Sequence, residues 1–360
     1  MEQNGGRNNN FGFLRLLLAT LVIVSHSPQI LDGSRSREIL TRAFGTISLG
    51  DFAVDGFFII SGYLVTKSFL QDPSVFSYLG KRALRIYPGF LAGFWICVLL
   101  IAPFVSGATR ILSTSTLLQE FPNAIGLQEP LVKGVFFGMA YPNLNSPMWT
   151  IGFEFKCYIF TMCLALAGLY ARKWRAFALV GMVALLGINA YDPIPHGVHW
   201  NSMVRFAAVF GVGILYYIYR DKVRFTHRGA IVSALMLALL LFSKRWAETS
   251  VAIFGGYLIF WIAFKLPVFR LSKMANKTDL SYGMYLYAWP IASIIAWNFR
   301  HINPWLLSAF TFAGAVVVAY SSWTFVEKPA LRLIKRGATA PTHFDPAIAV
   351  KRDMEDVTAL

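Results

Sequence analysis

The first long apolar stretch of the chain, residues 11–30, contains two ionisable side chains, Arg15 and His26. An ionisable group in hydrocarbon costs several kcal/mol unless it is paired or lines a wet cavity, so such a group indicates function. Eleven residues are about three helical turns, which place both side chains on one face, about 16 Å apart along the axis. That face offers a fixed cation and an imidazole that exchanges protons near neutral pH. The alternative is a bundle helix in which Arg15 snorkels and His26 caps a turn.

Carboxylates in the second apolar stretch, residues 49–70, are placed where they could orient this imidazole. Asp51 and Asp55 are four residues apart and share a helix face, and we expect Asp55 to lie level with His26. A carboxylate there would hold the imidazole tautomer and stabilise its charged form, as in histidine-based catalysis. The alternative is structural: Asp51 caps its helix and Asp55 pairs with Arg15.

Glu154 is a second candidate acid, because it lies about a turn and a half inside the fourth apolar stretch, residues 148–170. An unpaired carboxylate at that depth is neutral or strongly perturbed. An acid near a histidine favours an acid–base role. The alternative is that Glu154 pairs with Lys156 or Arg205 and only fixes helix packing.

Arg82 and Arg85 lie one turn apart in residues 71–88, which we predict to be a loop at the membrane surface. Paired guanidinium groups bind phosphate through several planar donors. The alternative interpretation is an anchor to anionic lipid.

No metal site is predicted. Asp192, His196 and His199 occur close together, but the prolines and glycine between them deny a shared helical face of ligands. Cysteines lie in apolar segments at no metal-like spacing, and all are expected to be small buried hydrophobic residues; they are Cys97, Cys157 and Cys163.

The elements that must position these residues are membrane helices. With 56% hydrophobic and 14% charged residues and a mean hydropathy of +0.54, the chain is not a soluble globule. Apolar stretches of near-spanning length must satisfy their backbone groups internally and are therefore helical. We predict an all-α polytopic membrane protein of about ten transmembrane helices, with residues 1–336 as one domain and 337–360 as a disordered cytoplasmic tail. The expected spans are 11–30, 49–70, 89–105, 148–170, 176–190, 204–219, 230–242, 251–264, 282–298 and 305–326.

The net charge of +15 follows mainly from the distribution of basic residues between the two sides of the membrane, so no nucleic acid is expected as a partner. With the N-terminus in the cytoplasm, most Lys and Arg residues of the loops fall on that side, and both termini are cytoplasmic. These residues are Arg82, Arg85, Arg172, Lys173, Arg175, Arg220, Lys222, Arg224, Arg228, Arg270, Lys273, Lys277, Lys335 and Arg336.

Four sequence features, in order, resemble the acyltransferase type 3 family of integral membrane acyltransferases, which modify surface polysaccharides, lipopolysaccharide, peptidoglycan or secreted lipo-oligosaccharides. The resemblance covers about residues 14–332, and one departure from it is Ala288, where the family often has histidine. The segments are LRLLLATLVIVSH at 14–26, AVDGFFIISGYL at 53–64 with RALRIYP at 82–88, WTIGFEFKCY at 149–158, and DLSYGMYLYAWP at 279–290 with FVEKP at 325–329.

The resemblance implies an acyl donor, usually acetyl-coenzyme A, on the cytoplasmic side of a bacterial inner membrane, and a carbohydrate acceptor reached from the other face. It implies that His26 is the catalytic histidine and Arg15 its partner along the helix. Arg82 and Arg85 become candidates for the phosphates of the coenzyme.

We therefore expect acyl transfer to a carbohydrate hydroxyl, with membrane lipid around the protein. His26, oriented by Asp55 or Glu154, would either deprotonate the hydroxyl or carry the acyl group itself, and the sequence leaves both routes open. One alternative is a transporter or flippase for a lipid-linked saccharide, and another is a scaffold in a polysaccharide assembly complex. The sequence does not predict the oligomeric state.

Overall fold

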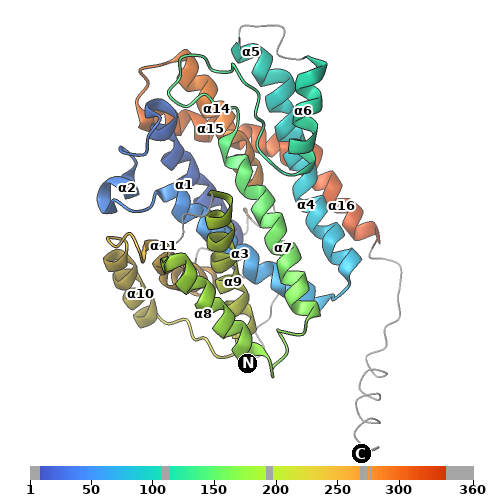
Figure 1. Cartoon of the computed structure of the whole chain (residues 1–360), viewed down its shortest axis with the longest axis vertical. Helices are drawn as coiled ribbons and strands as arrows, with labels where there is room; N and C mark the ends of the chain where they lie inside the picture. The colour runs from blue at the N-terminus through green and yellow to red at the C-terminus, as the bar shows by residue number, and fades with distance from the viewer. Residues whose placement is uncertain are drawn as a thin grey trace, which may run out of the picture.

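The structure, a computed structural model, describes residues 9–106, 113–191, 198–267, 272, 275 and 278–337. Every regular element in these residues is helical, and Figure 1 shows the long helices side by side. Seven of the helical segments are long and apolar enough to cross a membrane. With two shorter apolar helices and the 18-residue α14, ten helical segments of the described chain correspond to the ten predicted spans. The prediction of an all-α polytopic membrane protein is confirmed.

Short π-helical and 3₁₀ turns separate or extend several of the helices. In chain order, the elements are α1 (Phe11–Asp32), α2 (Ile39–Phe44), α3 (Leu49–Gln71), α4 (Val75–Ile96), the π-helical turn η1 (Cys97–Ile101), α5 (Ala102–Ser106), α6 (Thr114–Ile125), the 3₁₀ turn η3 (Ser146–Met148), α7 (Trp149–Leu166), α8 (Arg175–Tyr191), α9 (Val198–Ile218), α10 (His227–Leu240), α11 (Ala247–Ser250), the π turn η4 (Val251–Gly255), α12 (Gly256–Lys265), α14 (Ser281–Asn298), α15 (Pro304–Ser322), the π turn η5 (Trp323–Glu327) and α16 (Lys328–Gly337).

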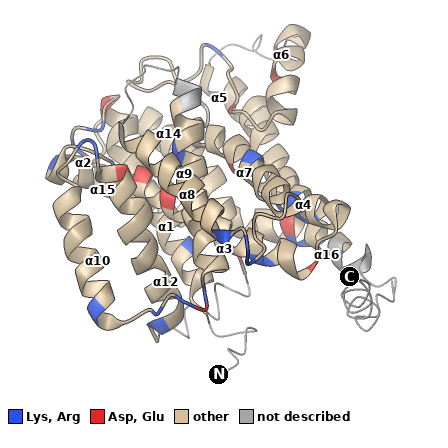
Figure 2. Cartoon of the chain, turned by 60° about the horizontal axis from the view of Figure 1, so that its bottom comes forward, with Lys and Arg blue, Asp and Glu red and all other residues tan. Residues whose placement is uncertain are grey.

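The long helices alternate in direction, so the bundle has two ends, which we call the Arg15 end and the His26 end. At the Arg15 end, the Asn10 side chain before α1 donates to the carbonyl of Ile262 near the end of α12, at 2.9 Å. At the His26 end, Ser308 of α15 donates to Ser27 of α1 at 2.8 Å. Figure 2 shows that Lys and Arg residues gather largely at helix ends and in the connections between helices.

The third span begins earlier in the chain than predicted. Residues 71–88 are mostly helix, because α4 begins at Val75 and continues through η1 and α5 to Ser106. Arg82 and Arg85 therefore lie on a helix instead of in a surface loop. Two connections predicted as loops also contain helices, α2 and α6. A hydropathy average does not reveal the early start of α4, because it does not account for a partner such as Asp279 that neutralises Arg85.

Short polar residues set where the helices start. Ser48 accepts a hydrogen bond from the backbone N–H of Asp51 at 3.1 Å, and the Asp51 carboxylate accepts one from the backbone N–H of Ser48 at 3.1 Å. This reciprocal cap satisfies two N–H groups that the first turn of α3 leaves unpaired. The capping alternative for Asp51 is thus confirmed.

The helix α1 lies in the middle of the bundle, in contact with α3, α14 and α15. Its exposed residue Leu17 lies nearly opposite Arg15 and His26 around the helix, so these two side chains point into the protein. Two of the cysteines, Cys97 and Cys157, are buried as predicted, whereas Cys163 is exposed and its predicted burial is wrong.

The closest helix crossing joins α3 to α9 through two glycines. A Cβ atom on Gly62 would lie 2.1 Å from the carbonyl oxygen of Phe210, and one on Gly213 would lie 2.1 Å from that of Ile59. Only hydrogen fits at either position, so the two backbones touch. Small residues permit this approach, and membrane helices gain their packing energy from it.

We expect Gly62→Ala to lower the free energy of unfolding by about 1–3 kcal/mol, because the added methyl group forces α3 and α9 apart. A thermal unfolding series in detergent measures this. Gly181→Ala in α8 is the matched control, since nothing lies within 4 Å of its added Cβ, and this variant should be no less stable than the parent. Equal melting temperatures for the two variants would contradict the close crossing.

Candidate active site

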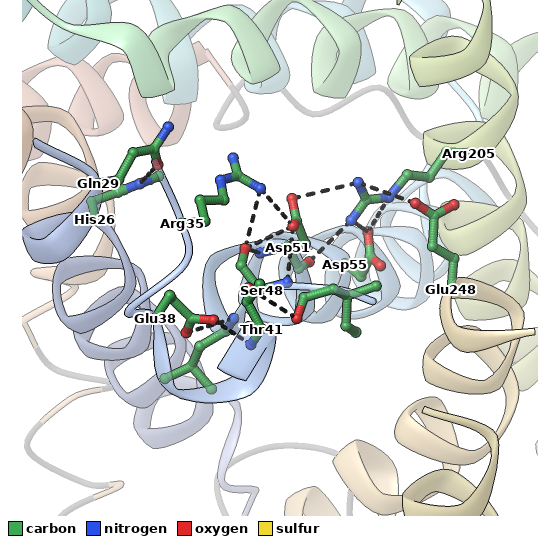
Figure 3. Close-up of polar contacts among 12 residues, drawn as sticks. His26, Gln29, Arg35, Glu38, Thr41, Ser48, Asp51, Asp55, Arg205 and Glu248 are labelled. Atoms are coloured by element: carbon green, nitrogen blue, oxygen red, sulfur yellow. Dashed lines mark hydrogen bonds and ion pairs between the residues drawn. The ribbon is translucent and has the colours of Figure 1, made fainter. Parts of the chain in front are cut away.

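His26, near the His26 end of α1, is in contact with neutral side chains. Its Nδ1 lies 3.0 Å from Oε1 of Gln29, one helical turn further along, and its ring meets the Trp289 ring edge-on with 5.0 Å between centroids. Figure 3 shows His26 and Gln29 together, apart from the ion pairs around Asp51. The His26 side chain is half-buried, whereas the adjacent Ser25 and Ser27 are buried.

The contact with Gln29 fixes the imidazole tautomer. An amide oxygen only accepts hydrogen bonds, so Nδ1 of His26 carries the hydrogen and donates it to Oε1. The lone pair is then on Nε2, which is free to take a proton or to attack an electrophile. A neutral amide takes the place that the sequence assigned to a carboxylate.

Trp289 is held by the connection between α6 and η3. The indole N–H of Trp289 donates to the carbonyl of Asn143 at 3.1 Å, and the Tyr141 ring packs edge-on to the indole at 5.3 Å. The connection is thereby held against α14. The ring that contacts His26 is in turn held in one orientation.

At the Arg15 end, three helices meet at one carboxylate. Asp279, just before α14, binds Arg15 of α1 at 2.7 Å and Arg85 of α4 at 2.5 Å, both through Oδ2. Glu327 of η5 lies 3.8 Å from Arg85. Burial alone would raise the pKa of Asp279, but the two guanidinium groups hold it well below its usual range. The side chains of Arg15, Arg85 and Asp279 keep 17–27% of their surface accessible.

Arg82 differs from Arg85 in its partners. Its Nη2 donates to Ser68 at 3.3 Å, and its guanidinium lies 5.8 Å from the ring centres of Tyr78 and Tyr158. Its Nε is buried without a hydrogen-bond partner, and no ion pair joins it to a carboxylate in the described part of the chain. Arg82 is therefore a cation held by neutral groups with one donor unused.

Glu154 lies between these two regions and contacts neither His26 nor the cations predicted for it. Its Oε1 accepts from Ser61 of α3 at 2.8 Å and from Tyr158 at 2.6 Å. Tyr158 thus links the carboxylate to Arg82. The predicted pairing with Lys156 or Arg205 is wrong: Lys156 lies over the Phe153 ring.

Asp55 is completely buried and belongs to an ion network at the His26 end (Figure 3). Arg205 of α9 binds it at 2.9 Å and lies 3.6 Å from Asp51 and 3.7 Å from Glu248, while Arg35 binds Asp51 at 2.7 Å. The expected contact between Asp55 and His26 is not formed, and its alternative, a pair with Arg15, is wrong too.

Four residues of this arrangement were not predicted from the sequence as site residues: Gln29, Arg205, Asp279 and Trp289. Arg205 and Asp279 carry a usable signal, because each lies in or beside an apolar stretch and needs a partner of opposite charge. Gln29 and Trp289 carry none, since an amide or an indole in a membrane helix is not by itself unusual.

No three His, Cys, Asp or Glu side chains gather as metal ligands would within the residues the structure describes. Asp192, His196 and the side chain of His199 lie outside those residues.

Comparison with known proteins gives one family and three similar relatives, two of which match most of this chain. The family model described as "Acyltransferase domain" matches residues 8–324. Nodulation protein 10 of Rhizobium leguminosarum bv. viciae is 29% identical, over 92% of this chain and 95% of the relative. An O-acetyl transferase of Shigella phage Sf6 is 26% identical, over 89% of this chain and 96% of the relative. No solved structure matches.

We expect Arg205→Met to destabilise the protein by about 3–5 kcal/mol, because it leaves the Asp55 carboxylate buried without its partner. Adding Asp55→Asn should recover much of that loss, since the charge is removed. The control Arg35→Gln breaks a partly exposed pair and should cost about 1 kcal/mol or less. Detergent unfolding of the parent and these three variants measures the differences, and a double variant less stable than Arg205→Met would contradict the prediction.

The connection that holds Trp289 also predicts a pH dependence. Burial raises the pKa of Glu129 to about 7, against a hydrogen bond from Ser146 that lowers it, and its Oε2 has no hydrogen-bond partner. Because the folded pKa exceeds the unfolded value, the folded state holds this proton more tightly. The stabilisation that Glu129 contributes is therefore fully present below about pH 4.5 and is lost as the pH rises to about 7.

We expect the melting temperature to fall between pH 5 and pH 8, and Glu129→Gln to remove part of that fall. Scanning calorimetry of both proteins across this range measures the effect. Identical pH profiles would exclude Glu129 as a cause.

Proposed function

This chain belongs to the acyltransferase family, and from that premise we propose that it moves an acetyl or other short acyl group from acyl-coenzyme A to a carbohydrate hydroxyl. One observation carries the proposal. A single face of α1 connects the cation cluster of Arg15, Arg82 and Arg85 at one end of the bundle to the half-buried imidazole of His26 near the other. The O-acetyl transferase among the relatives supports acetyl as the group transferred.

The Arg15 end suits the phosphates of the donor. Arg82 has a buried donor without a partner and no carboxylate beside it, so a phosphate oxygen can complete its hydrogen bonds. Arg85 and Arg15 already share Asp279, and we propose that they add positive potential more than direct contacts. Arg82 and Arg85, which the sequence analysis assigned to the same role, therefore have different roles in this proposal.

A stripe along α3 gives the acyl arm its proposed route. Phe57, Ser61, Leu64 and Ser68 are three or four residues apart and are all half-buried, while neighbouring residues on the other faces are mostly buried. Ser68 binds Arg82 and Ser61 binds Glu154, so the stripe starts at the cation cluster and runs toward the His26 end. The Arg15 to His26 separation of about 16 Å is comparable to the length of a pantetheine arm.

His26 performs the chemistry through Nε2. In the first route, Nε2 takes the proton of the acceptor hydroxyl while its oxygen attacks the thioester carbonyl. The carbon–sulfur bond then breaks, and the proton passes to the sulfur of the leaving coenzyme. In the second route, Nε2 attacks the carbonyl, the carbon–sulfur bond breaks, and the coenzyme leaves as a thiolate. The hydroxyl oxygen then displaces Nε2 from the acyl carbon, and the hydroxyl proton passes to the thiolate, which returns the imidazole to its neutral form. Gln29 serves both routes, because it keeps Nδ1 protonated and stabilises the imidazolium.

The other predicted site residues receive supporting roles in this proposal. Arg15 fixes α1 to Asp279, and Glu154 holds Ser61 and Tyr158 along the route. Asp55, through Arg205, holds α3 against α9 near the acceptor side.

We place the Arg15 end in the cytoplasm of a bacterial inner membrane, with both termini on that side. The basic connections at that end support this orientation, since cytoplasmic loops are enriched in Lys and Arg. They include Arg172, Lys173, Arg220, Lys222 and Arg224. The acceptor would then be a cell-surface or secreted carbohydrate reached from the His26 end.

Acetyl transfer is tested with purified protein in nanodiscs, radiolabelled acetyl-coenzyme A and an envelope glycan fraction. We expect His26→Ala to abolish labelling of the glycan. Gln29→Leu should lower kcat by about 10²–10⁴-fold, because the tautomer is no longer held, and should leave KM for acetyl-coenzyme A unchanged. Arg82→Gln should mainly raise that KM.

The exposed pair partner Arg37→Gln is the control and should match the parent. Saccharide movement across vesicles without acetyl-coenzyme A would instead support a flippase. Unchanged labelling by His26→Ala would remove the imidazole from the mechanism.

A further inference from the structure

A cavity lies at the His26 end, where the chain turns from α14 into α15. It has a volume of about 800 Å³ and is lined mainly by apolar atoms. This is within the range of small-molecule sites. Its lining includes Ile295 and Phe299 on one side and Ile302 and Phe310 on the other, with Arg300 and His301 among them. Phe299 and Phe310 are exposed. In Figure 1 this hairpin lies at the edge of the bundle.

A fixed cation lies at this apolar cavity. Arg300 donates to the carbonyl oxygens of Gly138 at 2.6 Å and Phe137 at 2.9 Å. Carbonyl groups orient the guanidinium without neutralising it, and no ion pair with a carboxylate is formed within the described residues. Gly138 makes this approach possible, since a Cβ there would lie 3.1 Å from Nη1. Two of the five N–H groups are used, so the others remain for an anion.

The position along the helices is that of lipid headgroups. Arg300 lies two residues beyond the end of α14, and the exposed Trp305 is the second residue of α15. Tryptophan is enriched at the boundary between hydrocarbon and water. An apolar cavity with a cation at that depth is complementary to a lipid whose head carries a negative charge.

We propose that this cavity binds one anionic phospholipid from the leaflet at the His26 end. The phosphate contacts Arg300, with His301 beside it, and an acyl chain enters the cavity against Ile295 and Phe310. Planar guanidinium groups bind phosphate oxygens through paired hydrogen bonds. The proposal stands on the cavity and the cation and does not depend on acyl transfer.

The test uses full-length protein in phosphatidylcholine nanodiscs that contain a small fraction of photoreactive phosphatidylglycerol, with the reactive group in the chain. Cross-linked peptides are mapped by mass spectrometry, and photoreactive phosphatidylcholine serves as the neutral probe. We expect phosphatidylglycerol to label residues 291–310 preferentially. Arg300→Gln should lower that labelling about fivefold, the effect of one basic residue at an anionic membrane surface, and leave labelling by phosphatidylcholine unchanged.

The matched control is Arg37→Gln, a basic residue at the same end that already pairs with Asp32. This variant should keep full labelling. Ile295→Trp fills the cavity without changing charge and should also reduce labelling, which covers the case in which Arg300→Gln does not fold. Three results would each overturn the proposal. They are equal labelling by the two lipids, unchanged labelling of both cavity variants, and displacement of phosphatidylglycerol by millimolar inorganic phosphate.

Discussion

Arg15 and Arg85 share a single carboxylate oxygen of Asp279, and much of the bundle depends on this contact. It joins α1, α4 and α14 at a depth where an unpaired charge would cost several kcal/mol. Because the counter-charge is supplied from a distant part of the chain, two arginines can lie on helices in an apolar protein. The ion network of Arg205, Asp51 and Asp55 solves the same problem at the opposite end.

Neither charged network contacts the imidazole, which has neutral contacts. The side chains that contact His26 within the described residues are an amide and an indole, and the indole is held by a further hydrogen bond and by the Tyr141 ring. Charges at both ends therefore fix the helices, while neutral groups fix the ring. The separation of these tasks follows from the low dielectric of the interior, where a carboxylate next to the ring would bring its own desolvation cost.

Sequence reasoning predicted the helical class, most span boundaries and the shared face of Arg15 and His26, because hydropathy and helical period are local properties. It placed Arg82 and Arg85 in a loop, since a local average cannot include Asp279, which lies far along the chain. It predicted a contact between Asp55 and His26 because the two residues have similar depths in the membrane. Depth does not determine in which direction each side chain points around its helix. Arg205 occupies the position that decides the pairing of Asp55.

The glycine crossing of α3 and α9 has a consequence for motion in the protein. Two backbones in direct contact cannot slide past each other without steric overlap, and neither helix has a side chain there that could change rotamer to make room. These helices therefore form the stationary part of the molecule during turnover. Any opening that admits substrate therefore has to leave this crossing intact and move segments whose contacts are made by side chains that can rearrange.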